Sequence, residues 1–173
     1  MADVTYYSLH IRWQQKDLFG IWCTGAGDRF FSKDGKVDLQ GERAALLRYA
    51  EAHAIQLEPE EPIPHDLDQV AAWLKQPSAP DAKAEALEAL LNAWNMLNDL
   101  NVAIGTPNSF AALEPTTQDL YDKLFSAHMT AQPDDWLTQR LGLDEPEWSP
   151  DEIQSLVEVM TEGLRFFRDV IGA

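Results

Sequence analysis

Residues 5–13, TYYSLHIRW, decide the class of the N-terminal part of the fold. Side chains of two kinds alternate along this stretch. The set expected to be buried comprises Tyr7, Leu9, Ile11 and Trp13, and the set expected on the other face comprises Tyr6, Ser8, His10 and Arg12. Because successive side chains of a strand point to opposite faces of a sheet, this period of two predicts a half-buried β-strand.

More strands are expected directly after this one, up to residue 40. Gly25–Asp28 has the composition of a turn, and Asp34-Gly35 supplies the positive-φ residues of a tight hairpin. The strands predicted around these turns are Leu18–Thr24, Arg29–Ser32 and Lys36–Leu39. Residues 1–40 therefore predict an antiparallel β-meander of three to four strands.

From residue 41 onward the apolar residues recur at helical spacing. The expected helical segments are 42–55, 66–74, 81–104, 116–128, 133–141 and 149–171. The meander and the helices together predict a single α+β domain over 1–173, with residues 41–173 mainly helical and forming a bundle of about five to six helices. No internal repeat or Gly/Ser linker divides the chain.

The ends of the helical segments carry recognisable signals. Residues expected to cap helix starts are Asp66, Thr116, Thr117 and Ser149. Ser149 is followed by Pro150 and Glu152, the pattern of a capping box. Pro59, Pro62 and Pro64 fall within 56–65, which predicts an extended connector because proline fixes φ and removes a backbone donor.

Charge is distributed unevenly along the chain. Residues 1–50 carry 6 acidic and 7 basic side chains, whereas residues 51–173 carry 23 acidic and 6 basic ones, and the net charge of the whole chain is −16. Such a field repels nucleic acid and anionic lipid, and it attracts basic proteins. Acidity that serves only solubility is the alternative. We expect a protein partner, and neither nucleic acid nor membrane.

The chain has no stretch of the roughly 20 apolar residues that a membrane span needs. Its first residues have neither a basic leader nor an apolar signal core, and Cys23 is the only cysteine, so no internal disulfide can form. These features predict a cytoplasmic protein.

Motifs for catalysis fail on spacing. Residues 24–28, TGAGD, begin like a dinucleotide-binding loop, but Phe30 stands where the third glycine is required. Cys23 lies in an apolar strand, where burial raises a thiol pKa and leaves it inert. The histidines are not at zinc-ligand spacing, and no calcium loop is present near Asp144. We therefore expect no catalytic residues, no metal and no cofactor.

Two surfaces are predicted to bind a partner. The first is a polar stripe on the helix expected over 81–104, at steps of three and four residues: Glu85, Glu88, Asn92, Asn95 and Asp99. The second consists of tryptophans set among carboxylates in loops: Asp134, Asp135, Trp136, Asp144, Glu145, Glu147 and Trp148. The alternatives are a solvated helix face and tryptophans that fold back over the helical core.

The chain resembles bacterial immunity proteins, the small neutralisers made beside contact-dependent growth inhibition toxins or other polymorphic toxins. The resemblance rests on residues 29–35 (RFFSKDG), 47–50 (LRYA) and above all 90–100 (LLNAWNMLNDL). It implies a non-enzymatic protein that binds a cognate basic toxin, often a nuclease domain, and blocks it sterically and electrostatically. Another acidic binding module, such as a nucleic-acid mimic or an adaptor, is the alternative, and an enzyme with scattered carboxylates is a third.

Overall fold

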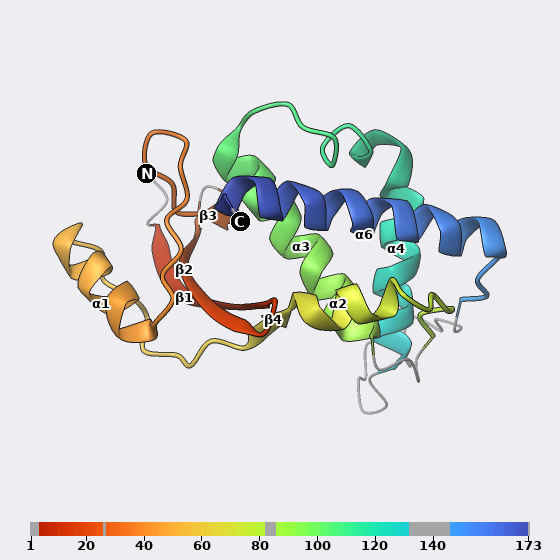
Figure 1. Ribbon diagram of the computed structural model, residues 1–173, viewed down its shortest axis with the longest axis horizontal. Helices are drawn as coiled ribbons and strands as arrows, with labels where there is room; N and C mark the ends of the chain where they lie inside the picture. Colours follow the sequence, from red (N-terminus) through yellow and green to blue (C-terminus); the bar gives the residue numbers. More distant parts are fainter. Residues whose placement is uncertain (1–3, 26, 82–85, 132–145, 173) are drawn as a thin grey trace.

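The computed structural model describes residues 4–25, 27–81, 86–131 and 146–172 (Figure 1). Its strands are β1 (Thr5–Trp13), β2 (Lys16–Thr24), β3 (Arg29–Phe30) and β4 (Pro64–Asp66). Its helices are α1 (Arg43–Ala52), α2 (Leu67–Trp73), α3 (Leu87–Ile104), α4 (Glu114–Thr130) and α6 (Pro150–Ile171). The mixed α+β class is therefore confirmed.

The sheet has the strand order β3-β2-β1-β4. β1 and β2 pair antiparallel along their full lengths, from Thr5 opposite Thr24 to Trp13 opposite Lys16. Gln14 and Gln15 join them with φ of 52° and 61°, and their backbone N–H groups both donate to the Asp68 carboxylate at 2.7 Å. A side chain at the start of α2 thus holds this hairpin turn.

The prediction that the sheet is wholly antiparallel is wrong, because β4 pairs parallel with residues 10–12 of β1. The chain reaches this position through α1 and the proline-containing connector, whose Leu57 also bridges Tyr6 in the parallel sense. Parallel pairing needs a long crossover of this kind. Pro64 is tolerated because β4 lies at the edge of the sheet, where its missing donor is not needed.

The region after β2 contains less strand than predicted. The tight turn at Asp34-Gly35 is present, with φ of 55° and 71°, and Lys33 and Lys36 exchange two backbone hydrogen bonds of 2.9 and 3.0 Å around it. However, β3 ends at Phe30, and 36–39 is not a strand. The chain rejoins the sheet only at Gln40, which exchanges two backbone hydrogen bonds with Phe19 on β2.

The two faces of the sheet are covered by different helices (Figure 1). α1 covers one face through a small cluster of Ile21, Leu46 and Ala50. The other face packs against the remaining helices through a larger cluster, in which Leu9, Ile11 and Phe30 are the buried residues from the sheet. The predicted alternation of β1 therefore holds, since Leu9 and Ile11 are buried on the face toward the helices.

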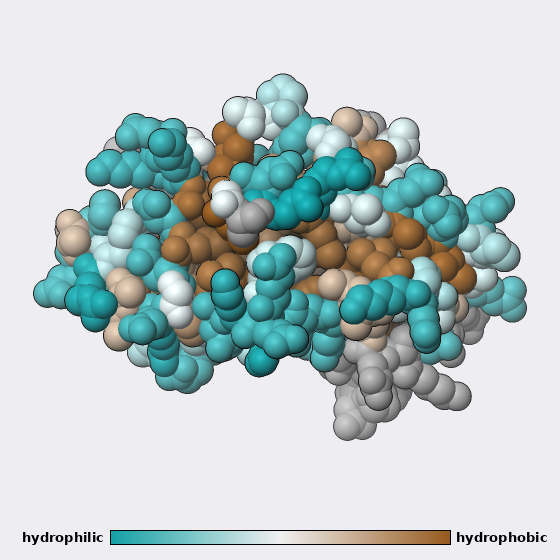
Figure 2. Space-filling model, viewed as in Figure 1, coloured by the Kyte–Doolittle hydropathy of each residue, from teal (hydrophilic) through white to brown (hydrophobic). Residues whose placement is uncertain are grey.

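α3 is the central helix of this larger cluster, with nine buried residues and contacts to β3, α2, α4 and α6. α6 crosses it, and its Phe167 packs edge-on against Trp13 at 5.8 Å between ring centroids. Figure 2 shows apolar residues in a band along the face that carries α6, flanked by hydrophilic ones. Such flanking is typical of an amphipathic helix over a core.

The predicted helix caps agree with the structure in two cases and differ in one, and the helix predicted over 81–104 begins at Leu87. Ser149 and Glu152 form the predicted capping box of α6, and Asp66 accepts from Gln69 N at the start of α2. Thr116 and Thr117 do not cap α4, which begins two residues earlier at Glu114; their hydroxyls donate back to the Leu113 carbonyl at 2.9 and 3.0 Å. The helix predicted over 133–141 lies outside the described residues.

Across the described residues, none of the helices is long and apolar enough to span a lipid bilayer.

Candidate functional site

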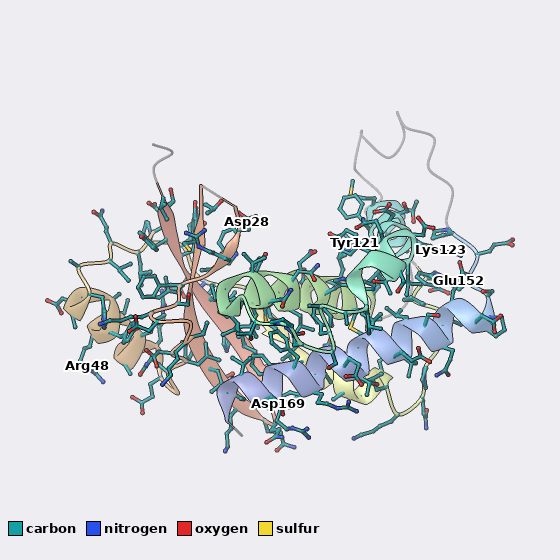
Figure 3. All side chains as sticks on the ribbon, turned by 90° about the horizontal axis from the view of Figure 1, so that it is seen from above. Asp28, Arg48, Tyr121, Lys123, Glu152 and Asp169 are labelled. Atoms are coloured by element: carbon teal, nitrogen blue, oxygen red, sulfur yellow. The ribbon has the colours of Figure 1, made fainter. Side chains whose placement is uncertain are left out.

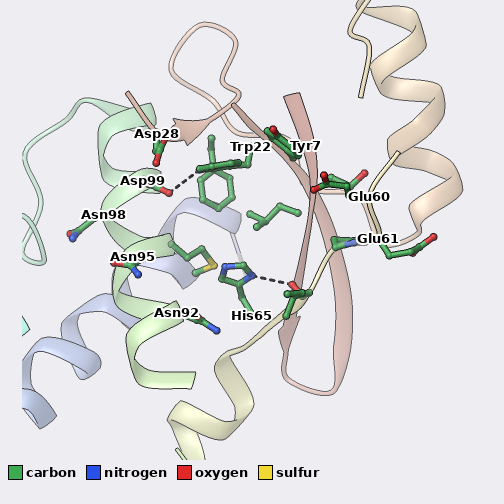
Figure 4. A pocket seen from close by; sticks show the side chains of 16 residues that line it. Tyr7, Trp22, Asp28, Glu60, Glu61, His65, Asn92, Asn95, Asn98 and Asp99 are labelled. Carbon is green, nitrogen blue, oxygen red and sulfur yellow. Dashed lines mark hydrogen bonds between the residues drawn. The ribbon is translucent and has the colours of Figure 1, made fainter. Parts of the chain in front are cut away.

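A cleft of about 810 Å³ lies between the sheet and one side of α3 (Figure 4). The cleft lies on the same face of the sheet as the main core, and Leu9 and Phe30 belong to both. Its polar and aromatic lining comes from four parts of the chain: Tyr7, Ser8, Trp22, Asp28, Glu60, Glu61, His65, Asn92, Asn95, Asn98 and Asp99. Apolar lining residues are Leu9, Phe30, Pro62, Ile63 and Met96.

The connector between α1 and β4 makes one wall of the cleft. It is anchored to β1 at two points, where Leu57 bridges Tyr6 and where Pro64 pairs with His10. Between these points the connector has more residues than β1, and it includes two prolines, which disfavour a regular strand. The surplus therefore bends away from β1, and residues 60–63 line the cleft.

The opposite wall is the polar side of α3. Asn92, Asn95 and Asp99 follow each other at steps of three and four and all line the cleft, as does Asn98. The Asn95 side-chain oxygen accepts a 2.8 Å hydrogen bond from the Tyr121 hydroxyl on α4. The asparagines place side-chain amides, which both donate and accept, at the surface of the cleft.

Asp99 is a partly buried acid at the α3 wall of the cleft. Its carboxylate accepts a 2.9 Å hydrogen bond from the indole Nε1–H of Trp22. Desolvation by burial raises the pKa of Asp99 to about 6, and the nearby charge of Asp28 adds to the rise, while the Trp22 hydrogen bond opposes it. A carboxyl that is costly to ionise is therefore held on a rigid helix beside an aromatic ring.

Three other acidic residues line the cleft. Asp28 accepts a 2.7 Å hydrogen bond from the Thr24 hydroxyl. Glu60 is exposed on the connector. Glu61 points away from the cleft toward α1 (Figure 4), where it forms a 2.6 Å ion pair with Arg43 that compensates its charge. No lysine or arginine is among the described residues that line the cleft. A concave surface with one sign of charge focuses the potential and favours cations.

His65 contributes a ring that is not cationic at neutral pH. Its Nδ1 donates to the Ile63 carbonyl at 3.3 Å. Burial lowers the pKa of His65 below its ordinary value, despite hydrogen bonds to backbone carbonyls. The histidine therefore does not neutralise the carboxylates around it.

The structure places the residues of the predicted stripe in different surroundings. Asn92, Asn95 and Asp99 line the cleft, and Asp99 faces the sheet, where it bonds Trp22. Glu88 is exposed in the first turn of α3 and does not line the cleft. Glu85 lies outside the described residues.

The predicted loop surface is described only at its end. Glu147 is exposed, whereas Trp148 is half-buried and packs against the main core. Lys123 lies 5.2 Å from the centroid of the Trp148 ring and forms a 2.6 Å ion pair with Glu152 (Figure 3). The remaining residues of that prediction lie outside the described residues: Asp134, Asp135, Trp136, Asp144 and Glu145.

The sheet and connector side of the cleft is not predicted by the sequence patterns. The patterns place Tyr7 and Trp22 only in strands, and Glu60, Glu61 and His65 only in a connector, whereas all five line the cleft. One available signal was the amphipathic chemistry of Tyr7 and Trp22, which have apolar bodies and polar tips suited to a half-open site. The parallel return of the connector, which brings its carboxylates beside β1, has no local signal.

Metal and nucleophile chemistry have little support in the described part of the chain. Among those residues there is no group of three or more His, Cys, Asp or Glu side chains that could hold a metal ion. Cys23 is buried, its thiol donates to the Arg29 carbonyl at 3.4 Å, and burial raises its pKa. The arrangement in the cleft is suited to holding a cation by charge, amide groups and aromatic faces.

Comparison of the chain with protein-family models, with curated protein sequences and with solved structures finds no match.

Proposed function

We propose that this chain is a cytoplasmic immunity protein, which binds a cognate cationic toxin domain and neutralises it by steric and electrostatic blocking. The observation that carries the proposal is the acidic cleft: Asp28 from the turn before β3, Asp99 from α3 and Glu60 from the connector line a concave surface whose described lining includes no lysine or arginine. A basic surface that otherwise contacts nucleic-acid phosphates would find carboxylates in their place. The net charge of −16 would speed the encounter.

The geometry supports a binding role for the cleft more than a catalytic one. Asp99 is hydrogen-bonded to Trp22, and His65 is bonded to the backbone of its own segment. Neither contact joins a nucleophile to a base, which is the arrangement that acid–base and covalent catalysis require. The Asp99 carboxylate and the asparagine amides are instead positioned on α3, which the core holds in place, as a preformed docking site needs.

The experiment is co-expression with the product of the adjacent gene. We expect a stable one-to-one complex, and rescue of cells from that product's toxicity. The Asp28→Lys variant should slow association and flatten its dependence on ionic strength, because Asp28 lies in the cleft. Glu88→Lys makes the same charge change outside the cleft and should have a much smaller effect.

Three results would count against this proposal. The absence of both complex and protection would remove the immunity function. Equal effects of Asp28→Lys and Glu88→Lys would assign binding to the general charge and not to the cleft. Binding to several unrelated basic proteins would favour the second candidate, an acidic adaptor or nucleic-acid mimic.

A further inference from the structure

Trp22 and Tyr7 form an aromatic surface at one end of the cleft. Their ring centroids lie 5.5 Å apart with the planes tilted by 47°. The hydrogen bond from the Trp22 indole to Asp99 fixes the orientation of the Trp22 ring. Figure 4 places Asp28 beside Asp99, next to this ring. An aromatic plane and two carboxylates from different elements therefore meet at one point.

Both carboxylates keep an oxygen for another donor. Asp99 uses Oδ2 to accept from Trp22, and Asp28 uses Oδ1 to accept from Thr24. Among the described residues, no side chain donates to the other oxygen of either carboxylate. The charge of Asp28 raises the pKa of Asp99, which indicates that the two carboxylates repel each other. A cation placed between them would relieve this repulsion.

We propose that this end of the cleft binds a guanidinium group, the side chain of an arginine on the basic partner. The inference rests on the proposed function and specifies the chemistry of its site. A guanidinium is planar, so that it can stack on the Trp22 ring while its N–H groups donate to carboxylates at its edge. An ammonium group is a compact point charge and cannot use both kinds of surface in this way.

The rest of the cleft suits the chain around such an arginine. The volume of the whole cleft, about 810 Å³, is more than one arginine side chain requires. This volume falls within the range of about 300–1,000 Å³ that is usual for ligand sites. Ile63, on the connector wall, is 71% exposed and offers an apolar contact at the rim. Asn92 and Asn95 on the facing wall can bond backbone groups of the partner.

The test uses the isolated full-length chain and N-acetyl-arginine amide as the probe. The indole N–H resonance of Trp22, assigned with a Trp22→Phe variant, reports on the site because this group bonds Asp99. We expect a saturable shift of that resonance with the arginine probe. N-acetyl-citrulline amide, which has a similar shape without the charge, should leave it unchanged, and N-acetyl-lysine amide should bind several times more weakly.

Variants separate the site from the overall charge. Asp28→Asn and Asp99→Asn should each weaken probe binding about tenfold, because each removes one charge-assisted hydrogen bond. In the Asp99→Asn variant the side-chain amide oxygen can still accept from the Trp22 indole, which keeps the reporter in place. Asp119→Asn removes the same charge from the exposed surface of α4 and should leave the affinity unchanged.

The inference is overturned if the Trp22 resonance does not move, if citrulline produces the same shift, or if Asp119→Asn weakens binding as much as Asp28→Asn. Tighter binding of methylguanidinium than of the arginine probe would also overturn the inference, because the cleft would then prefer a small free cation to the side chain of a protein arginine. The titration contains no toxin. It can therefore fail while the complex with the toxin forms, and it can succeed while no such complex is found.

Discussion

Replacing Asp99 by asparagine should stabilise the protein at neutral pH. In the folded chain the Asp99 pKa is raised from its ordinary value of 3.8 to about 6, mainly because burial disfavours the charged form. Converted in full, this pKa shift corresponds to about 3 kcal/mol of lost folding free energy in the ionised form, since one pKa unit corresponds to about 1.4 kcal/mol. The side chain is only half-buried, so that solvent screening reduces the expected gain to about 1–2 kcal/mol.

The pH dependence of this gain has a definite sign. Between pH 4 and pH 6 the folded state binds more protons at Asp99 than the unfolded state does, so the stability of the wild type falls as pH rises through this window. The amide that replaces the Asp99 carboxyl in the variant does not titrate. The advantage of the variant should therefore be near zero below pH 4, grow up to about pH 6, and stay constant above pH 7.

The measurement is urea denaturation of wild type and Asp99→Asn at half-unit steps from pH 4 to pH 8. The groups that face Asp99 are Trp22 from β2, Asp28 before β3 and Tyr121 from α4, and both proteins share them. Asp119→Asn serves as the control for lost surface charge. A gain that does not depend on pH, or a loss of stability at pH 8, would refute the assignment of the burial cost to Asp99.

Further predictions concern the packing and the helix start. Glu152→Ala should lower the free energy of unfolding by about 1 kcal/mol at pH 7, because it removes half of the capping box. The hydrogen bond from Lys123 lowers the folded-state pKa of Glu152 to about 2. Urea denaturation should therefore show the difference between wild type and variant fading as pH falls from 4.5 toward 2. Gly163→Ala would place a Cβ 2.5 Å from Leu97 Cδ1. Overpacking should lower stability by about 1–3 kcal/mol, and the better helix propensity of alanine should offset about 1 kcal/mol of this loss. A net gain in stability would mean that the Leu97 side chain moves aside freely. Cys23 should react with a thiol reagent only as fast as the protein unfolds, and fast labelling of the native protein would contradict its burial.

The sequence predicted the elements whose signals are local. The alternation in β1, the turn at Asp34-Gly35 and the capping box at Ser149 each depend on residues within a few positions of one another. β4 could not be predicted in this way. Its pairing with β1 depends on tertiary contacts between segments about 54 residues apart, and the prolines around it argue against a strand at any position but an edge.

The candidate site was predicted from one wall only. Helical spacing placed Asn92, Asn95 and Asp99 on one side of a helix, and those three residues do share a wall of the cleft. Spacing along a helix carries no information about the surface that faces it, so the bond between Asp99 and Trp22, 77 residues apart, had no signal. The same limit made Glu88 look equivalent to Asp99, although Glu88 lies away from the cleft.

The bent connector allows the recognition surface to change separately from the fold. Its two anchoring points, at Tyr6 and His10 of β1, fix where the segment enters and leaves, whatever the length between them. Substitutions or insertions within 58–63 would then reshape one side of the opening without shifting the strand register or the helix packing. A single short segment can thus alter which surfaces fit the opening while the fold stays the same.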